Sequence, residues 1–343
     1  MRLGINLGPA GAADLARRAE ELGYELALVP EGFNSDAASV LGNLAARTTT
    51  IKLASGVFQI AARTPVMTAM TTATLDRLSN GRFHLGLGVS NAYVTEGWHG
   101  LPYDRPLRRT REYVEIVRAA LSREQVTYRG EHFRLPLRPV RGEPFRLLVP
   151  GLSKSIPIYL AAVGSRNLEL AGEIADGWIG VFCTPDAIAK ALTHVHAGRR
   201  RASRESGRFE VIPSVPLSVH HDPREAARPI AAHVARFVSL GEREVNVYFS
   251  LLERMGYGEA AEKIQDRYRT GDHEGAASAV PLEFVDETSL LGSPGRVAER
   301  MRAFARAGTT VLAVSAFART LGDQLKALQI AAEQLDRMRK GDS

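Results

Sequence analysis

The sequence predicts an α/β fold, a (β/α)8 TIM barrel with insertions in its βα-loops. Three observations lead to this class. Short apolar segments alternate with amphipathic segments along the 343 residues, eight such strand–helix units can be counted, and neither a repeat of fixed period nor a low-complexity linker divides them. Eight units in one chain favour a closed barrel over a doubly wound sheet, so we expect a single barrel domain over residues 1–343.

The first four units follow one another closely. Their strands are predicted at residues 2–7, 25–30, 51–57 and 83–89. The helices between them are predicted at residues 12–23, 35–48 and 64–81. Gly23 is placed to end the first helix, and Ser35 or Asp36 to cap the second. Thr64 followed by Pro65 is typical of the start of a helix.

The last four units are separated by longer segments. Their strands are predicted at residues 156–163, 177–182, 209–220 and 309–317. Helices are predicted at residues 165–175 and 293–308. Residues 122–155 contain hairpin-like pieces, and residues 240–290 are expected to form two or three extra helices. In a barrel, such insertions shape the substrate-binding end, and a separate small domain is the alternative.

The composition excludes several classes of protein. Apolar residues make up 45% of the chain and charged residues 24%, which is ordinary for a globular protein. The apolar runs are too short to span a bilayer, and residues 1–11 lack the features of a signal or transit peptide. The single cysteine, Cys183, rules out a disulfide within the chain. We therefore expect a cytoplasmic protein with no membrane partner.

The formal net charge of +6 bears on the choice of partner. Four arginines gather between residues 199 and 204 without interleaved aromatic residues, as expected of a solvated helix end. No recognisable nucleic-acid module accompanies them, so we expect no nucleic-acid partner. A basic balance suits an anionic small molecule instead.

The stretch HLGLGVSN, residues 84–91, has the form of an incomplete dinucleotide-binding loop. Gly86 and Gly88 have the right spacing, but Asn91 stands where a third glycine is needed. No small-residue helix follows, and no acid for a ribose appears about 20 residues further on. We therefore place this stretch at the end of the fourth strand, where glycines would let a flat ring approach the backbone.

Four stretches, taken in order, carry a family resemblance. They are residues 31–65, 75–100 (LDRLSNGRFHLGLGVSNAYVTEGWHG), 156–178 (IPIYLAAVGSRNLELAGEIADGW) and 290–314. Together they resemble the luciferase-like flavin and deazaflavin oxidoreductases, and the similarity extends from residue 1 to about residue 317. The likeness is closest to the branch that uses coenzyme F420, which includes methylenetetrahydromethanopterin reductase. The resemblance implies a cofactor at the C-terminal ends of the barrel strands.

The resemblance also implies a cofactor-supporting bulge at the end of the third strand. The family places a non-prolyl cis peptide there, beneath the deazaflavin or isoalloxazine ring. The matching bond is Gly56–Val57, and both residues are predicted to bind the cofactor. An ordinary strand end, with Gly56 in a turn, is the alternative.

A phosphate site is predicted where the fifth strand enters its helix. Gly164 and Ser165 lead into the helix, whose free N–H groups and positive dipole end attract an anion. Ser165 and Arg166 can add a hydroxyl and a guanidinium, and Val163 precedes them on the strand. Taken alone, the same residues would only cap a helix. A phosphate here fits F420 and FMN alike.

Other strand ends are expected to line the pocket. The candidates are Asn6, Glu31, Gln59, Gly88, Asn91 and Trp178. Glu31 is the sharpest catalytic candidate, because a partly desolvated carboxylate can bind the ring or transfer a proton. Its alternative role is to support the helix that begins near Asp36. Some F420 dehydrogenases of the family carry a His directly after this acid and a Glu at the position of Asn91. Gly32 and Asn91 stand there instead, which favours hydride donation from the reduced cofactor over alcohol oxidation.

Two further residues complete the catalytic candidates. His99, in TEGWHG with Glu96 and Trp98, could protonate a substrate, although a His beside a Trp is more often structural. Asn91 is the other candidate. The sequence has no metal-ligand spacing, P-loop or nucleophile elbow, so no metal site, phosphoryl transfer or serine nucleophile is expected.

These observations predict a coenzyme F420-dependent oxidoreductase that transfers a hydride between the deazaflavin C5 and an unsaturated organic substrate. One alternative is an FMN-dependent luciferase-like monooxygenase that uses reduced flavin and O2. Another is a flavin-binding protein without turnover. By resemblance we also expect a homodimer, with the helix that begins at Thr64 facing the partner.

Overall fold

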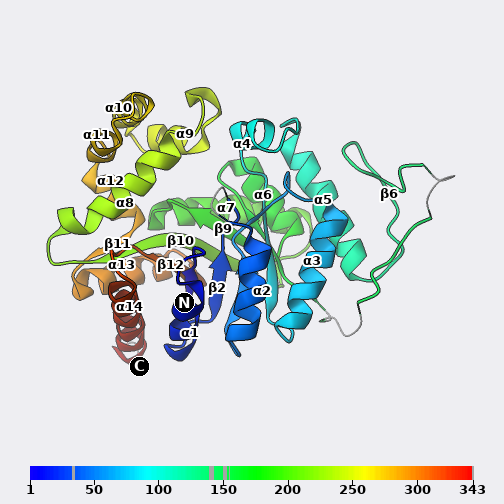
Figure 1. Ribbon diagram of the computed structural model, residues 1–343, viewed down its shortest axis with the longest axis horizontal. Coiled ribbons are helices and arrows are strands. Elements are labelled where there is room, and N and C mark those ends of the chain that lie inside the picture. Colours follow the sequence, from blue (N-terminus) through cyan, green and yellow to red (C-terminus); the bar gives the residue numbers. More distant parts are fainter. Residues whose placement is uncertain (33–34, 139–142, 150–152, 154, 342–343) are drawn as a thin grey trace.

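The computed structural model describes residues 1–32, 35–138, 143–149, 153 and 155–341 (Figure 1). Its barrel strands are β1 (Arg2–Asn6), β2 (Leu26–Val29), β3 (Lys52–Ser55), β5 (Phe83–Gly88), β8 (Ile158–Ala161), β9 (Gly177–Val181), β10 (Glu210–Val219) and β12 (Val311–Ala316). Each strand pairs in parallel with the next, and β12 pairs with β1. The sheet is therefore closed. The predicted (β/α)8 fold is confirmed, and every strand lies within its predicted range.

The inside of the barrel is a packed core. Its buried apolar side chains are Leu26, Leu28, Ala54, Tyr159, Ile179, Ile212, Val311 and Ala313. At the N-terminal ends of the strands, Arg2 forms ion pairs with Glu25 and Glu210. This packing leaves the C-terminal ends of the strands, where barrels carry their sites, for a ligand.

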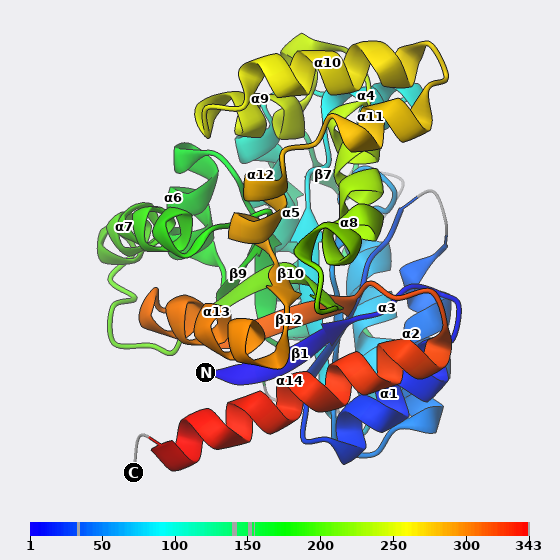
Figure 2. The same ribbon diagram turned by 90° about the vertical axis from the view of Figure 1, so that its left-hand side faces the viewer.

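Helices cover the outside of the barrel (Figures 1 and 2). Five were predicted: α1 (Ala12–Glu21), α2 (Ala37–Arg47), α3 (Pro65–Leu78), α6 (Ser165–Ile174) and α13 (Pro294–Arg306). Three more were not placed from the sequence: α5 (Pro106–Leu121), α7 (Pro185–Arg201) and α14 (Leu321–Gly341). Asp36, rather than Ser35, caps α2 by accepting the N–H of Ser39 (2.8 Å). Thr64 caps α3, with Pro65 as its first residue.

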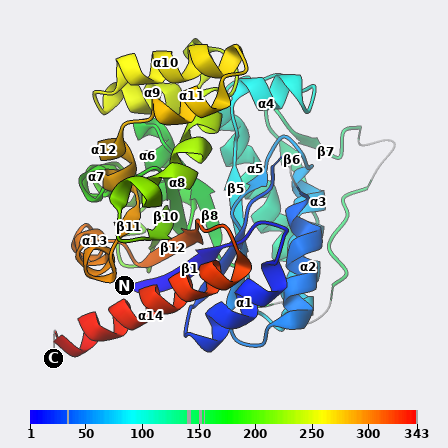
Figure 3. The same ribbon diagram turned by 60° about the vertical axis from the view of Figure 1, so that its left-hand side comes forward.

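The insertion at residues 122–155 includes a short hairpin that projects from the barrel on the side of α3 and α5 (Figures 1 and 3). Its strands, β6 (Tyr128–Arg129) and β7 (Arg134–Leu135), are antiparallel, as predicted. The fully buried carboxylate of Glu112 on α5 accepts the N–H groups of residues 131–133 at 2.9–3.2 Å. Glu112 therefore anchors the hairpin. Residues 139–142, 150–152 and 154 of this insertion lie outside the described residues.

The second insertion lies at the C-terminal side of the barrel, next to α8 (Pro223–Val238). It holds a 3-10 turn (Arg243–Val245), α9 (Val247–Arg254), α10 (Gly258–Arg269), α11 (His273–Ser278) and α12 (Leu282–Thr288). The expectation of two or three helices was wrong, because Asp272 caps α11 and Pro281 begins α12 after very short breaks. These helices share a second apolar core that also includes Phe182. The single domain stays a prediction. A short strand, β11 (Leu290–Gly292), pairs with β10.

Candidate active site

The third barrel strand ends in a cis peptide bond. The bond between Gly56 and Val57 is cis, and the chain resumes as β4 (Phe58–Gln59), which pairs with β5. The N–H of Gly56 donates to the carbonyl of Val29 (2.8 Å), and the N–H of Glu31 donates to the carbonyl of Val57 (3.4 Å). The predicted cis bulge is therefore confirmed, and the end of β2 holds it on one side.

The glycines of β5 make room for this bulge. A Cβ on Gly86 would lie 2.0 Å from the carbonyl oxygen of Ser55, and a Cβ on Gly88 would lie 2.6 Å from a methyl group of Val57. The hydroxyl of Ser55 also donates to the carbonyl of Gly86 (2.8 Å) and accepts from its N–H (2.9 Å). The interpretation that these glycines leave room for a ring therefore needs correction, because the neighbouring strand fills the space. A contact between Gly88 and the cofactor stays a prediction.

Glu31 belongs to a largely buried ion pair. Its carboxylate accepts hydrogen bonds from the N–H of Gln59 (3.0 Å) and from the guanidinium of Arg63 (2.8 Å). The exposed fraction of the side chain is 9% for Glu31 and 14% for Arg63. Arg63 also pairs with Asp36 and lies 4.8 Å from the centre of the Phe58 ring. Because both oxygens of Glu31 are engaged, this carboxylate joins β2 to β4 across the bulge.

The charges of this network reinforce one another. Burial opposes the charge on Arg63, but hydrogen bonds and charge from Glu31 and Asp36 outweigh it and raise the pKa of Arg63. Burial likewise opposes ionisation of Asp36, yet the hydrogen bonds of Ser39 and the charge of Arg63 lower the pKa of Asp36. Arg63 and Asp36 therefore stay charged near neutral pH.

Gln59 connects Glu31 to His99. Nε2 of His99 lies 2.9 Å from Oε1 of Gln59, and Nε2 of Gln59 donates to the backbone carbonyl of Glu31 (3.2 Å). An amide oxygen only accepts, so this contact favours the His99 tautomer with its proton on Nε2. His99 follows α4 (Ala92–Gly97) and is half-buried. The structure thus brings three predicted site residues together.

The side chains of Asn91 and Asn6 form hydrogen bonds within the protein. Asn91 is buried, and its amide oxygen accepts the N–H of Val94 (2.9 Å) as the N-cap of α4. The amide nitrogen of Asn6 donates to the hydroxyl of Ser214 (2.9 Å) and to the carbonyl of Ala313 (3.1 Å). Their contacts with a cofactor or substrate stay predictions.

Trp178 does not lie on a pocket wall. Its side chain is 2% exposed, in the core between strands and helices, and its indole N–H donates to the carbonyl of Ala162 (2.8 Å). Successive side chains of a strand face opposite sides, and Ile179 is the residue that faces into the barrel. The expectation for Trp178 is corrected accordingly.

The N-terminus of α6 is open to a ligand. Gly164 is its N-cap, no described side chain caps it, and its first turn has no acidic residue. Residues 163–166 are exposed. The unpaired N–H groups and the positive end of the helix dipole can bind a phosphate, with Ser165 and Arg166 beside them. The structure thus leaves the predicted phosphate position accessible.

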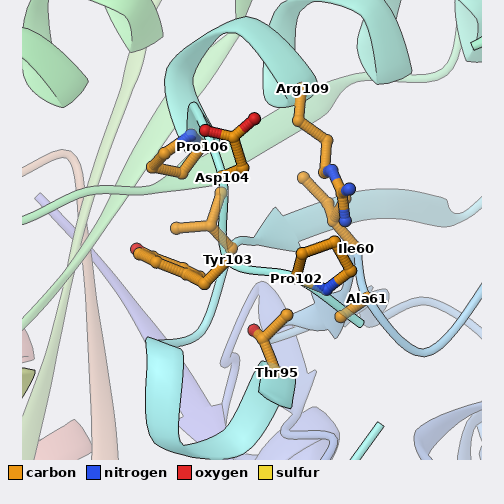
Figure 4. A pocket seen from close by; sticks show the side chains of 9 residues that line it. Ile60, Ala61, Thr95, Pro102, Tyr103, Asp104, Pro106 and Arg109 are labelled. Atoms are coloured by element: carbon orange, nitrogen blue, oxygen red, sulfur yellow. The ribbon is translucent and has the colours of Figure 1, made fainter. Parts of the chain in front are cut away.

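A small cavity adjoins the site but cannot hold a substrate. It lies between the segment after β4, α4 and the start of α5, and Figure 4 shows its lining side chains, among them Thr95, Tyr103 and Arg109. Its volume is about 10 Å³, which suits one water molecule.

Sequence reasoning missed two contributors to the site. It identified neither the pairing of Arg63 with Glu31 nor the bridge from Ser55 to Gly86. One signal was present for Arg63, which directly precedes the helix cap Thr64. An arginine pairs strongly with a carboxylate or a phosphate. The spacing of Ser55 offered no comparable signal.

The model of the luciferase-like monooxygenase family matches residues 5–311. The chain belongs to this family. This luciferase-like protein is 35% identical to a putative coenzyme F420-dependent oxidoreductase of Mycobacterium tuberculosis, over 92% of this chain and 95% of that protein. It is 31% identical to the 5,10-methylenetetrahydromethanopterin reductase of Archaeoglobus fulgidus, over 92% of each chain. It matches the structure of the coenzyme F420-dependent tetrahydromethanopterin reductase of Methanopyrus kandleri with a TM-score of 0.83 and 26% identity, over 98% of this chain and 99% of that one. The resemblance inferred from the sequence is confirmed.

Two negative findings concern this luciferase-like protein. Among the residues that the structure describes, no three His, Cys, Asp or Glu side chains gather as metal ligands would. Within the same residues, no helix combines the length and apolar character needed to cross a membrane.

Proposed function

We propose that this chain is a coenzyme F420-dependent oxidoreductase that transfers a hydride to an unsaturated organic substrate. The observation that carries the proposal is its similarity to F420-dependent relatives over more than nine-tenths of its length. The cis bulge at Gly56–Val57 and the open N-terminus of α6 support it from the structure. Both features lie at the C-terminal ends of barrel strands, where barrel enzymes bind their ligands.

The described residues fit two chemically different parts of F420. Val57 and its cis bond offer an apolar support for a flat ring, and residues 164–166 offer N–H groups and a guanidinium to a phosphate. The net charge of +6 suits an anionic polyglutamate tail. When bound, reduced F420 supplies a hydride from C5 of its deazaflavin ring.

The chain itself supplies position, shielding and a proton. Glu31 and Arg63 hold the bulge in place, and the helices after β10 lie on the C-terminal side of the barrel, where they would shield a bound ligand from water. Of the catalytic candidates, Glu31 is ion-paired and the amide oxygen of Asn91 is a helix cap. His99 binds Gln59 through Nε2, and its Nδ1 has no hydrogen-bond partner within the described chain. In its imidazolium form, protonated from solvent, His99 carries a second proton on this Nδ1, and we assign the proton donor role to that form.

The same residues favour reduction of the substrate. Gly32 follows Glu31, where some F420 dehydrogenases carry a His, and the carboxylate of Glu31 is already bound to Arg63. Alcohol oxidation needs a base beside the reacting carbon, which these two positions do not supply. A C=C or C=N bond needs only a hydride and a proton donor, so a small unsaturated molecule is the proposed substrate.

The proposal includes a homodimer and a cytoplasmic location. Helix α3 carries large apolar side chains on its outer face, among them Met67, Met70 and Leu78. Such a face is typical of a protein–protein contact. The single buried cysteine, Cys183, favours the cytoplasm over an oxidising compartment.

Titration of the cofactor-free protein with oxidised F420 and, in parallel, with FMN tests the proposal. We expect F420 to bind with a dissociation constant at least tenfold below that of FMN, measured by fluorescence. Ser165→Asp adds a negative charge at the open end of α6 and should weaken F420 binding by about tenfold or more. Ser206→Asp makes the same change in an exposed loop after α7, at the opposite end of the barrel, and should leave binding unchanged.

Preference for FMN would overturn the assignment of F420 and support an oxygen-dependent monooxygenase with a partner reductase. Tight F420 binding without turnover across a panel of enones and imines would support a carrier or sensor. Equal effects of the two Ser→Asp changes would contradict the phosphate site at α6.

A further inference from the structure

A group of aromatic side chains, here called the aromatic wall, joins the helical insertion to the barrel. It consists of Phe182, His233, Phe237, Tyr248 and Phe317. The ring centres of His233 and Phe237 lie 4.7 Å apart, those of Phe237 and Tyr248 lie 4.9 Å apart, and those of His233 and Phe317 lie 5.2 Å apart. Phe182 lies behind them, 5.7 Å from Tyr248 and 6.0 Å from Phe237. The proposed function assigns no role to any of these residues.

The aromatic wall lies at the mouth of the barrel. Phe182 directly follows β9 and Phe317 directly follows β12, both at C-terminal ends. Phe317 also continues the alternation of β12 that points Val311 and Ala313 into the barrel. Hydride transfer is proposed at the same ends of the strands.

Phe237 lies at the end of α8 and Tyr248 at the start of α9, so both flank the turn between these helices. The turn reaches α4, where Gly241 lies so close to Tyr93 that a Cβ on this glycine would be 2.8 Å from the ring. Helix α4 follows β5, which is separated from β10 by β8 and β9. Figures 1 and 2 show α4, α9 and α10 together at one end of the molecule. The turn beside the aromatic wall therefore meets α4, which follows a strand on another side of the barrel.

Two buried amides fix this turn. The side-chain oxygen of Asn246 accepts the backbone N–H of Tyr248 (2.8 Å), and its nitrogen contacts three backbone carbonyls at 2.9–3.0 Å, those of Phe237, Val238 and Leu240. The side chain of Gln265 on α10 donates to the carbonyl of Gly241 (3.1 Å). Both side chains are buried, so the rings are held in position before any ligand arrives.

The aromatic wall presents rings and uncharged polar atoms to a ligand. Of its members only Phe182 is fully buried, and the others keep part of their surface exposed. Within the described residues, neither the hydroxyl of Tyr248 nor the ring of His233 has a hydrogen-bond partner. Burial, with the charge of Arg236, lowers the pKa of His233 to about 4, and burial raises the pKa of Tyr248 to about 12. Both groups are therefore neutral near pH 7 and can exchange hydrogen bonds with a neutral ligand.

We propose that the aromatic wall is the substrate subsite, and that it takes a planar aryl group conjugated to the reducible bond of an uncharged substrate. Phe237, Tyr248 and Phe317 stack on or against the aryl ring, and the Tyr248 hydroxyl donates to a carbonyl oxygen. The inference rests on the proposed function and specifies its substrate class. Rings in offset or edge-to-face contact attract one another more strongly than a ring and a saturated group of the same size.

A matched pair of enones tests the inference. 4-Phenylbut-3-en-2-one and 4-cyclohexylbut-3-en-2-one share the reducible bond and the ketone and differ in the aromatic character of one ring. We expect the phenyl compound to bind about tenfold more tightly to the protein saturated with oxidised F420, as measured by titration calorimetry. The same pair is measured on the cofactor-free protein.

Variants of the aromatic wall assign the preference to its rings. Phe237→Leu and Tyr248→Leu should each bring the ratio of the two dissociation constants close to one, with F420 affinity unchanged. Tyr248→Phe should weaken both enones alike and keep the ratio. Tyr268→Leu is the matched control, because Tyr268 lies in the same insertion but contacts His273 on α11, outside the aromatic wall, and its ratio should equal that of the unmodified protein.

A ratio near one in the unmodified protein, or a tenfold ratio that survives both leucine variants, would overturn the inference while F420 binding stands. If the unmodified protein does not bind F420, the proposed function fails, which is a separate outcome from failure of the inference. The enone ratio in the cofactor-free protein then still decides whether the aromatic wall binds aryl ligands.

Discussion

At the scale of single residues, Glu31 acts through Arg63 and Gln59. The carboxylate is buried and bound by both, so Glu31→Gln would leave the guanidinium of Arg63 with Asp36 as its remaining charged partner. We expect the variant to lose about 1–3 kcal/mol of unfolding free energy, because a buried charge loses a partner. Urea unfolding measures the loss. F420 affinity should fall with it, since the bulge is held less firmly.

The matched control is Asp14→Asn, which breaks the exposed pair of Asp14 with Arg17 on α1. An exposed pair contributes little, so this change should cost less than about 0.5 kcal/mol. If Glu31→Gln costs as little unfolding free energy as Asp14→Asn but abolishes turnover, the carboxylate is a catalytic group and does not act by holding the bulge in place.

Residue types and strand ends indicated most residues of the candidate site, but the sequence could not show which of them hydrogen-bond to one another. Glu31, Gln59 and His99 were each predicted, whereas their shared hydrogen bonds join residues 28 and 40 positions apart. Trp178 shows a second limit, because one residue of shift along a strand exchanges its two faces. The cis bond followed from family resemblance, since nothing in the residues Gly56 and Val57 requires it.

At the scale of elements, Glu20 on α1 holds the segment that leads into β3. Its carboxylate accepts three backbone N–H groups, those of Thr49 (2.9 Å), Thr50 (2.5 Å) and Ile51 (2.8 Å). Partial burial raises its pKa, but these hydrogen bonds outweigh burial and lower the pKa of Glu20 from 4.5 to about 2. The folded state therefore keeps this group ionised at a pH where the unfolded chain binds a proton.

The resulting stability is present above pH 4.5 and is lost as the pH falls toward 2. Glu20→Gln should lower the melting temperature at pH 6 and should reduce the further drop between pH 6 and pH 3. Glu21→Gln, at the neighbouring exposed position on α1, is the control and should follow the unmodified protein at both pH values. An identical drop in all three proteins would show that Glu20 does not couple folding to pH.

Strands and helices were predictable where apolar residues recur along the sequence in a simple pattern. The barrel strands are short buried runs between helices with clear caps, such as Thr64–Pro65, and all of them were found. The helices after β10 were harder to count. Helices α11 and α12 are short and separated by few residues, so their pattern merges with that of their neighbours.

At the scale of the whole molecule, the closed barrel fixes where chemistry can occur, and the insertions determine what reaches it. The interior is filled by side chains, so the cis bulge, the open end of α6 and the aromatic wall all gather at the C-terminal ends of the strands. The sequence predicted this arrangement because eight strand–helix units specify the barrel. It could not predict the aromatic wall, since its rings come from α8, α9 and the residues that directly follow β9 and β12.

The outer face of α3 leads to the last prediction, which concerns assembly. Met67, Met70 and Leu78 lie on this face with side chains about half exposed, and the insertion at residues 122–155 adds the exposed Phe145 and Leu148. A second copy of the chain would cover these residues, and a stable interface buries about 800 Å² per partner. Light scattering after gel filtration should therefore give twice the chain mass of 37.3 kDa.

Met70→Glu should shift the mass toward that of one chain, because it places a charge in the centre of the contact, whereas Leu321→Glu at the start of α14 should leave the dimer intact. A single-chain mass for the unmodified protein, or dissociation by Leu321→Glu alone, would contradict a dimer formed through α3.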